Sequence, residues 1–423
     1  MSVSEKDKKY IWHPFTQMKE AVQIPIVKGC GVWLFAEDGK KYVDAVSSWW
    51  VNIHGHSHPY MAEKMYQQFL ELEHVLFSGF TTPVATELAE RLILKMPWQQ
   101  KVFFSDNGST AVEVAVKMAI QYFKNKKEER NTLIVFKNAY HGDTFGAMSL
   151  SQKNIFNEAF SDFVFDVKTI SAPEYGLETE SINELKNIIK NEKVIALLYE
   201  PMIQGAGGMR IQNPLALNNV LELAKSKNIL LIADEVMTGF YRTGRMFASE
   251  YTTVKPDLMA LSKALTGGVM PLGLTTCTDA IYNEFLGSSI EKTFYHGHSF
   301  TGNPLACAAA CASLDLLEKQ ETKEQIVSIC ERQQEAASLF LAYNKVKKSR
   351  SLGTILALEL DAEQGYFSSI RGEMYSFFLQ KGIVLRPLGN VLYFMPPYCI
   401  NTNEINLVYE AIHEFLKTYQ SKE

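Results

Sequence analysis

The stretch NILLIADEVMTGFYRTGRMFASE, residues 228–250, indicates what kind of fold this chain adopts. It opens with an apolar run typical of a buried strand, and the run ends at two adjacent carboxylates, Asp234 and Glu235. Burying an unpaired charge costs much free energy, so such a group is normally paired, neutralised or part of a site. The stretch therefore raises the question of which positive partner an acid has at the end of this strand.

Similar apolar runs occur on both sides of this stretch. Residues 101–109 (KVFFSDNGS), 131–142 (NTLIVFKNAYHG) and 193–208 (KVIALLYEPMIQGAGG) each read as a strand followed by a turn. Segments with helical spacing of apolar residues, such as residues 110–128, lie between them. This alternation predicts an α/β fold with a mostly parallel sheet flanked by helices. The turns would then meet at the carboxyl edge of the sheet, where such folds bind ligands.

The pattern changes toward both ends of the chain. After about residue 315 a long surface helix and short strands predict a smaller α+β domain, residues 316–423. Residues 46–315 would form the large domain. Residues 1–45 contain an expected hairpin with its turn at Asp38-Gly39, and we expect this segment to pack with the small domain.

Composition narrows the class of protein. The 423 residues are 47% hydrophobic and 21% charged, with a net charge of −5 and a pI near 6.1, so nothing indicates binding to nucleic acid or to an anionic membrane. The N-terminus is charged and does not read as a signal peptide, and no run approaches a membrane-spanning length. Six scattered cysteines then favour free thiols in a reducing cytoplasm.

Two further motifs could carry chemistry. In SDNGST, Gly108 allows close approach of the backbone and Ser109 can cap the following helix, which makes an anion site suited to phosphate. In LSKALTGG, Lys263 lies among small and apolar residues, where desolvation favours the nucleophilic amine. Taken alone, an ordinary helix cap and a lysine that reaches solvent are the simpler interpretations.

Binding of pyridoxal phosphate would explain these motifs together. This cofactor needs a lysine for its Schiff base, a carboxylate for its pyridine nitrogen and an anchor for its phosphate. Lys263, Asp234 and the turn at Gly108 and Ser109 are candidates, and Tyr140 could stack on the ring. On this interpretation the positive partner of Asp234 is the pyridinium and not a protein side chain.

Longer motifs carry a family resemblance. They are IWHPFTQM, SSWWVNIHGHSHP, FFSDNGSTAVEVAVKMA, YHGDTFGAMSL, EPMIQGAGGM, LLIADEVMTGFYRTGRMFASE, PDLMALSKALTGG, HGHSFTGNPLACAAA and LRPLGNVLYFMPPY. Over nearly its whole length the chain resembles the fold-type I, class III aminotransferases. The resemblance implies that Lys263 forms the Schiff base and moves the proton, while Asp234, Gly108, Ser109 and Tyr140 hold the cofactor.

The resemblance also implies a homodimer with shared active sites. His298 and Ser299 would reach the phosphate in the neighbouring subunit, and Gly297 would lie close to the substrate. Trp49 and Phe15 would line the substrate pocket, and Arg386 would bind a substrate carboxylate.

The motifs are most similar to the branch of the family that aminates 8-amino-7-oxononanoate for biotin synthesis. Two positions depart from the pattern of many relatives: Phe15 replaces a tyrosine, and His298-Ser299 replaces Pro-Thr. The resemblance implies S-adenosylmethionine as the amino donor, and these departures keep lysine as the alternative donor. Other class III aminotransferases, a decarboxylase or aminomutase on this fold, and a scaffold protein without activity are the alternatives.

Three alternating histidines, His54, His56 and His58, are a conceivable metal site. No cysteine or acidic ligand accompanies them at a typical spacing, so we expect no metal.

Overall fold

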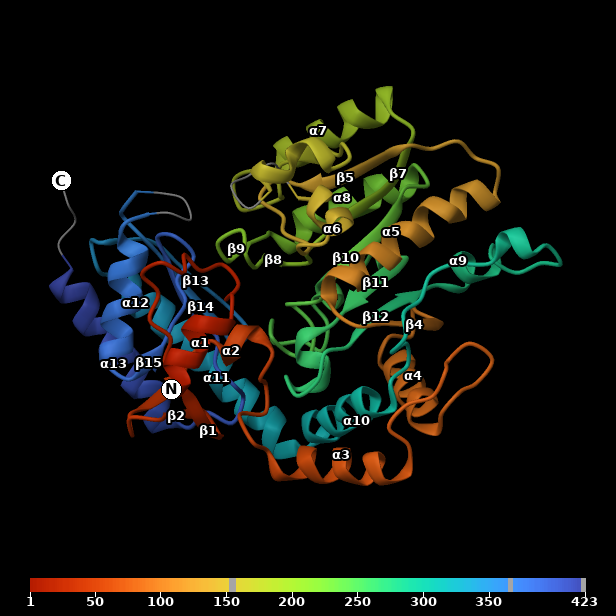
Figure 1. Cartoon of the computed structure of the whole chain (residues 1–423). Helices are drawn as coiled ribbons and strands as arrows, with labels where there is room; N and C mark the ends of the chain where they lie inside the picture. The colour runs from red at the N-terminus through yellow and green to blue at the C-terminus, as the bar shows by residue number, and fades with distance from the viewer. Residues whose placement is uncertain (152–156, 364–367, 420–423) are drawn as a thin grey trace.

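The structure is a computed structural model that describes residues 1–151, 157–363 and 368–419. Its main element is a seven-stranded sheet with the order β4-β12-β11-β10-β7-β5-β6, at the right in Figure 1. The strands are β4 (Lys101–Ser105), β5 (Thr132–Phe136), β6 (Lys168–Ile170), β7 (Val194–Tyr199), β10 (Leu230–Asp234), β11 (Leu258–Leu261) and β12 (Gly273–Cys277). In this sheet β12 is antiparallel to β11 and β4, and the other pairs are parallel. The predicted mostly parallel sheet is confirmed.

Both faces of the sheet are buried, which explains why its strands are continuously apolar. Along β10, Leu231 and Ala233 belong to one hydrophobic core, and Leu230 and Ile232 belong to a second core on the opposite face. The first core includes residues of α4 (Pro83–Lys95), α7 (Glu178–Asn191), α8 (Pro214–Ser226) and α10 (Pro304–Glu318). The second includes residues of α5 (Gly108–Asn125), α6 (Phe145–Ser149) and α9 (Asp279–Asn283). The predicted helices on both faces are therefore present.

The two ends of the chain come together at the left in Figure 1. One sheet there has the order β1-β2-β3-β15 and a second the order β13-β14-β16. Their strands are β1 (Ile26–Cys30), β2 (Trp33–Ala36), β3 (Lys41–Asp44), β13 (Val346–Leu352), β14 (Ile355–Leu360), β15 (Ile383–Val384) and β16 (Val391–Phe394). The helices of this part are α11 (Gln320–Leu341), α12 (Ile370–Gln380) and α13 (Thr402–Thr418).

The expected hairpin is confirmed, because β2 and β3 are antiparallel and Gly39 in their turn has φ 83°. Strand β3 continues the sheet by parallel pairing with β15, about 340 residues later in the chain. The division into domains at residues 45 and 315 stays a prediction.

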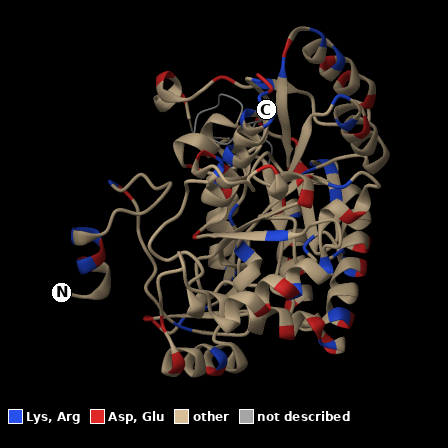
Figure 2. Cartoon of the chain, turned by 90° about the vertical axis from the view of Figure 1, so that its right-hand side faces the viewer, with Lys and Arg blue, Asp and Glu red and all other residues tan. Residues whose placement is uncertain are grey.

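The remaining described helices and strands lie outside these groups. They are α1 (Val3–Tyr10), α2 (Ser47–Trp50), α3 (Pro59–Glu71), η1 (Glu158–Phe163), β8 (Ile203–Gln204), β9 (Arg210–Ile211), η2 (Ala248–Tyr251), η3 (Lys263–Thr266) and η4 (Ile290–Lys292). Helix α1 buries none of its residues, and Figure 2 shows it apart from the body of the chain. Among the described helices, none is both long and apolar enough to cross a membrane. All six cysteines are free thiols.

Candidate active site

A cavity of about 560 Å³ lies at the carboxyl edge of the large sheet. The residues that follow β4, β5, β7, β10 and β11 line one side of it, and residues near β3, α2 and β15 line the other. Eight of the residues singled out from the sequence line this cavity: Phe15, Trp49, Gly108, Ser109, Tyr140, Asp234, Lys263 and Arg386. Its size is that of a typical small-molecule or cofactor site.

The amino end of α5 forms one wall of the cavity. Gly108 is the first residue of this helix, and a Cβ atom there would come within 2.7 Å of Val236 Cγ1. Gly142, with φ 129°, lies so close to Ser109 that a Cβ atom would overlap its Oγ. Backbone N–H groups at a helix start favour an anion such as phosphate.

The predicted capping role of Ser109 is wrong. Asn107 caps α5, because its side chain accepts a hydrogen bond from Thr110 N at 3.0 Å and the Thr110 hydroxyl accepts one from Asn107 N. Ser109 Oγ instead accepts a hydrogen bond from Asp143 N at 3.3 Å. Because asparagine and serine are equally good caps, the sequence SDNGST did not distinguish them.

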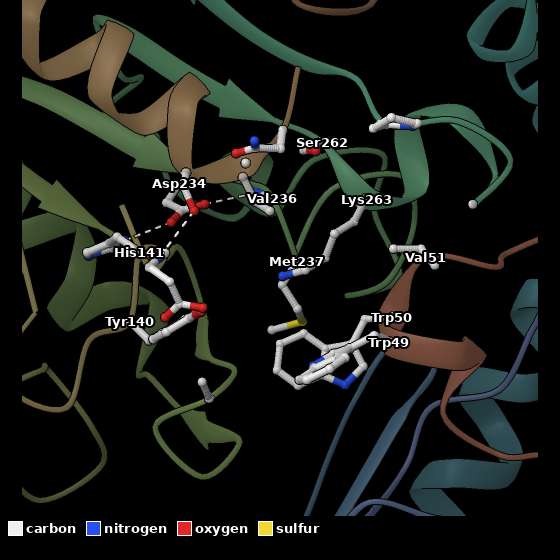
Figure 3. A pocket seen from close by; sticks show the side chains of 18 of the residues that line it. Trp49, Trp50, Val51, Tyr140, His141, Asp234, Val236, Met237, Ser262 and Lys263 are labelled. Atoms are coloured by element: carbon white, nitrogen blue, oxygen red, sulfur yellow. Dashed lines mark hydrogen bonds and ion pairs between the residues drawn. The ribbon is translucent and has the colours of Figure 1, made fainter. Parts of the chain in front are cut away.

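Asp234 stands at the end of β10 and faces the cavity (Figure 3). Its Oδ2 lies 2.7 Å from His141 Nδ1, and its Oδ1 accepts a hydrogen bond from Val236 N at 3.0 Å. Asp234 therefore has a protein side chain, His141, as a partner that the sequence did not predict, and its expected pairing with the pyridine nitrogen stays a prediction. The histidine was missed because a residue next to Tyr140 in a turn gives no signal of a contact 93 residues away.

Glu235, the second acid of the opening stretch, has a structural role. It is fully buried and accepts hydrogen bonds from Thr238 Oγ1, Ala248 N, Ser249 N and Ser249 Oγ. Burial raises the pKa of its carboxyl group, and these donors act against that rise. Glu235 thus holds the loop that follows the strand and does not face the cavity.

Lys263 begins η3, directly after β11, with a left-handed φ of 46°. Its Nζ lies 4.7 Å from the centre of the Trp50 ring, and Figure 3 shows the side chain reaching into the cavity. Burial lowers the pKa of this amine, and the charges of Asp234 and Glu200 partly oppose that effect. No carboxylate among the described residues lies within salt-bridge distance of it. Such an amine is poised to act as a nucleophile and a base.

Two other ionisable groups lie in the same wall. Glu200 follows β7 and accepts a hydrogen bond from Gly205 N at 2.9 Å. Burial raises the pKa of this carboxyl group to about 7, and Asp234 contributes to the rise. Burial also raises the pKa of Tyr140, with the charge of Asp143 adding to it.

Aromatic and cationic side chains form the opposite wall. The guanidinium of Arg386 lies 4.3 Å from the centre of the Trp49 ring, and the Phe15 ring lies 5.5 Å from that ring. Trp50 donates from Nε1 to Tyr393 Oη at 3.0 Å. Trp50 and Tyr393, which the sequence alone did not single out, line the cavity as well.

Gly297, His298 and Ser299 do not line the cavity of this single chain. They lie in the segment before α10, where Ser299 O accepts a hydrogen bond from His74 Nε2 at 2.7 Å. Their expected role concerns a neighbouring subunit, and it stays a prediction.

Known proteins resemble this chain over almost its whole length. The family model described as aminotransferase class-III matches residues 15–416. A curated relative from Synechococcus elongatus, named adenosylmethionine-8-amino-7-oxononanoate aminotransferase, is 44% identical over 96% of this chain and 98% of its own length. The chain belongs to the class-III aminotransferases.

Solved structures agree with this family. An adenosylmethionine-8-amino-7-oxononanoate aminotransferase from Methanocaldococcus jannaschii has a TM-score of 0.92 and 35% identity, and the match covers 98% of each chain. An amine transaminase from an uncultivated Pseudomonas species, solved with pyridoxal phosphate bound, has a TM-score of 0.90 and 28% identity over 96% of this chain and 97% of that one. The fold is therefore that of the pyridoxal-phosphate-dependent transaminases, and this class-III aminotransferase is a pyridoxal-phosphate-dependent enzyme.

The residues present fit that cofactor. The cavity combines a helix start for the phosphate, a carboxylate for the pyridine nitrogen and a desolvated lysine for the aldehyde. Two buried polar atoms, His141 Nε2 and Glu200 Oε2, have no hydrogen-bond partner in the described part of the chain. Buried polar atoms normally have partners, so this wall is suited to a polar molecule.

Proposed function

We propose that this aminotransferase converts 8-amino-7-oxononanoate to 7,8-diaminononanoate in biotin synthesis, with S-adenosylmethionine as the amino donor. The relatives that carry this activity in their names, at 35–44% identity over nearly the full length, support the proposal. The observation that carries it is Arg386, whose guanidinium lies over the ring of Trp49 in the wall of the cavity.

The acceptor has a ketone and an amine at one end, a methylene chain, and a carboxylate at the other end. Arg386 forms no ion pair with any described residue, so its charge is available for that distal carboxylate. Phe15 and Trp49 offer an apolar wall to the methylene chain. The two ends of the acceptor would then lie against Arg386 and toward Lys263.

When bound, pyridoxal phosphate supplies an aldehyde that carries the amino group and a ring that accepts electron density. Gly108 and Ser109 would hold its phosphate at the start of α5, and Tyr140 would stack on the ring. Asp234 would hold the protonated pyridine nitrogen, and His141 fixes the orientation of this carboxylate.

Lys263 would hold the aldehyde in the resting enzyme and then act as the base. In the donor half-reaction its Nζ would take the proton from the amine-bearing carbon of the donor and deliver it to the aldehyde carbon of the cofactor. In the acceptor half-reaction it would move a proton in the reverse direction, to the ketone carbon of the acceptor. The lowered pKa of this amine leaves more of it neutral, which a base needs.

The identity of the amino donor is the most specific part of the proposal. Phe15 has no hydroxyl group to offer a donor substrate, where many relatives have a tyrosine. Lysine as donor to the same acceptor is therefore the second candidate, and both donors belong in the same assay.

We further propose a homodimer in the cytoplasm. The segment with Gly297, His298 and Ser299 would complete the cavity of the partner, which explains why it lies outside the cavity of its own chain. Its exposed apolar side chains, such as Tyr295 and Phe300, favour an interface. Sedimentation of the enzyme at assay concentration tests the dimer, and an active monomer would contradict it.

The purified enzyme, loaded with pyridoxal phosphate, tests the reaction itself. It is incubated with 8-amino-7-oxononanoate and either S-adenosylmethionine or lysine, and 7,8-diaminononanoate is measured by mass spectrometry. We expect product with S-adenosylmethionine. Product with lysine but not with S-adenosylmethionine would show that lysine is the donor. No product with either donor would refute the function.

A further inference from the structure

Three of the four residues in α2 have a left-handed backbone. Ser47, Ser48 and Trp50 have φ values of 51°, 61° and 69°, and none of them is glycine. Residues with a Cβ atom adopt this conformation only where surrounding contacts enforce it. The turn is therefore held from outside, and it carries both tryptophans of the cavity wall.

The contact that holds the turn at Ser48 is Asp44, the last residue of β3, which is fully buried. Its carboxylate accepts hydrogen bonds from Ser48 N at 2.6 Å, from Ser48 Oγ at 3.0 Å and from Val46 N at 3.3 Å. These bonds fix the backbone at Ser48, a serine with a positive φ of 61°.

A second pair of residues fixes Asp44 in turn. His56 Nε2 lies 2.9 Å from Asp44 Oδ2, and His56 Nδ1 lies 3.1 Å from Asn52 Nδ2. A carboxylate only accepts, so the imidazole donates from Nε2 to Asp44. Asn52 also packs on Gly268, where a Cβ atom would come within 2.3 Å of its Oδ1. The network thus reaches the loop that follows Lys263.

Each indole ring of the turn lies beside a basic side chain of the cavity. Trp49 lies under Arg386 at 4.3 Å and Trp50 lies beside Lys263 at 4.7 Å, both measured to the ring centre. The two rings lie together in Figure 3, with Lys263 reaching toward them. A cation is attracted to the face of an indole ring, so the position of Trp49 influences where the Arg386 guanidinium stands, and Trp50 lies in contact range of the Lys263 amine.

We propose that Asp44, His56 and Asn52 form a positioning clamp that holds the left-handed turn and so sets where Trp49 and Trp50 stand in the cavity. None of the three touches the cavity, so they are positioning residues and not catalytic ones. The clamp deepens the proposed function, since an acceptor bound by Arg386 would depend on the place of Trp49.

The test replaces His56 and observes the two rings directly. The full-length enzyme, loaded with pyridoxal phosphate, is labelled with 5-fluorotryptophan, which gives one fluorine signal for each of its five tryptophans. Trp49→Phe and Trp50→Phe assign the two signals. We expect His56→Ala to move both by more than their line width and to leave the signal of Trp98 in place.

The control is Asp257→Asn. The buried carboxylate of Asp257 also accepts a backbone hydrogen bond, from Leu231 N, at the start of β10 and therefore on the side of the sheet away from the cavity. Asp257→Asn should leave the signals of Trp49 and Trp50 unmoved. If His56→Ala does not give folded protein, Ser48→Ala, which removes only the Oγ bond to Asp44, makes the same test.

The KM for 8-amino-7-oxononanoate is the second measurement. We expect His56→Ala to raise it by about tenfold, which corresponds to roughly 1.4 kcal/mol, and Asp257→Asn to leave it unchanged. Unmoved fluorine signals or an unchanged KM would overturn the clamp. If the wild-type enzyme does not use this acceptor, the proposed function fails, and the fluorine signals alone decide on the clamp.

Discussion

Asp234 Oδ2 and His141 Nδ1 lie 2.7 Å apart at the floor of the cavity, and both side chains are buried. This contact leaves the carboxylate with one fixed orientation, since its Oδ1 is bonded to Val236 N. A carboxylate that cannot rotate is prepared for a ligand atom that arrives from the cavity side.

Asp234→Asn should weaken both cofactor binding and turnover. A neutral amide cannot hold the positive charge of the pyridine nitrogen, and loss of one partner of such a buried pair costs about 2–5 kcal/mol, a factor of roughly 30 or more. Equilibrium dialysis of the cofactor and steady-state turnover measure the two effects. The control Asp257→Asn removes another buried carboxylate next to the same strand. Normal turnover of Asp234→Asn would remove Asp234 from the site.

Arg386→Ala should impair the use of 8-amino-7-oxononanoate by on the order of 30-fold or more, because it removes the partner of the distal carboxylate. The acceptor half-reaction, measured in single turnover, reports this directly. Arg332→Ala, on the surface helix α11, is the control and should have no effect. A defect confined to the donor half-reaction would assign Arg386 to the donor instead.

Glu200 should make the cofactor-free protein less stable as the pH rises. The pKa of this buried carboxyl is about 7, above its ordinary value of 4.5. Between these values the folded state holds a proton that the unfolded state has lost, so the free energy of unfolding falls by on the order of 1.4 kcal/mol per pH unit. Glu200→Gln removes this contribution, and exposed Glu63→Gln does not.

Denaturant unfolding of the wild type and both variants at pH 5 and pH 8 measures this effect. The stability of Glu200→Gln relative to the wild type should increase from pH 5 to pH 8. A relative stability that is the same at both pH values would show that Glu200 is not protonated in the folded protein.

The shared site can be tested by mixing two inactive variants. Lys263→Ala lacks the base, and Ser299→Glu places a negative charge where the phosphate of the partner's cofactor would lie. In a mixed dimer one cavity has both residues intact, so random mixing should restore about a quarter of the wild-type activity. No activity after mixing would contradict the proposal that His298 and Ser299 serve the partner.

Lys263→Ala by itself should still retain some cofactor.

The sequence predicted those features of the site that depend on local pattern. Runs such as residues 194–199 and 230–234 are long and apolar enough to mark buried strands, and parallel strands bring their carboxyl ends to one edge. Asp234 is the last residue of one such run and Lys263 stands two residues after another, so both had to lie at the same edge. Family resemblance added Trp49 and Arg386, and both line the cavity.

The features that the sequence did not predict depend on distant contacts. His141 meets Asp234, Trp50 meets Tyr393, and Asp44 meets His56, each through a side-chain direction that only the folded chain defines. The left-handed backbone at Ser47 and Ser48 was hidden for the same reason, because no glycine or asparagine marks it. Local sequence propensity does not predict a backbone conformation that tertiary contacts impose.

The most direct measurement of the central claim follows the visible absorbance of the cofactor on Lys263 through the two half-reactions. The loaded enzyme should absorb at roughly 400–430 nm. S-adenosylmethionine alone should abolish this band, and subsequent addition of 8-amino-7-oxononanoate should restore it with formation of 7,8-diaminononanoate. Loss of the band with lysine but not with S-adenosylmethionine would contradict the proposed donor, and failure of 8-amino-7-oxononanoate to restore it would contradict the function.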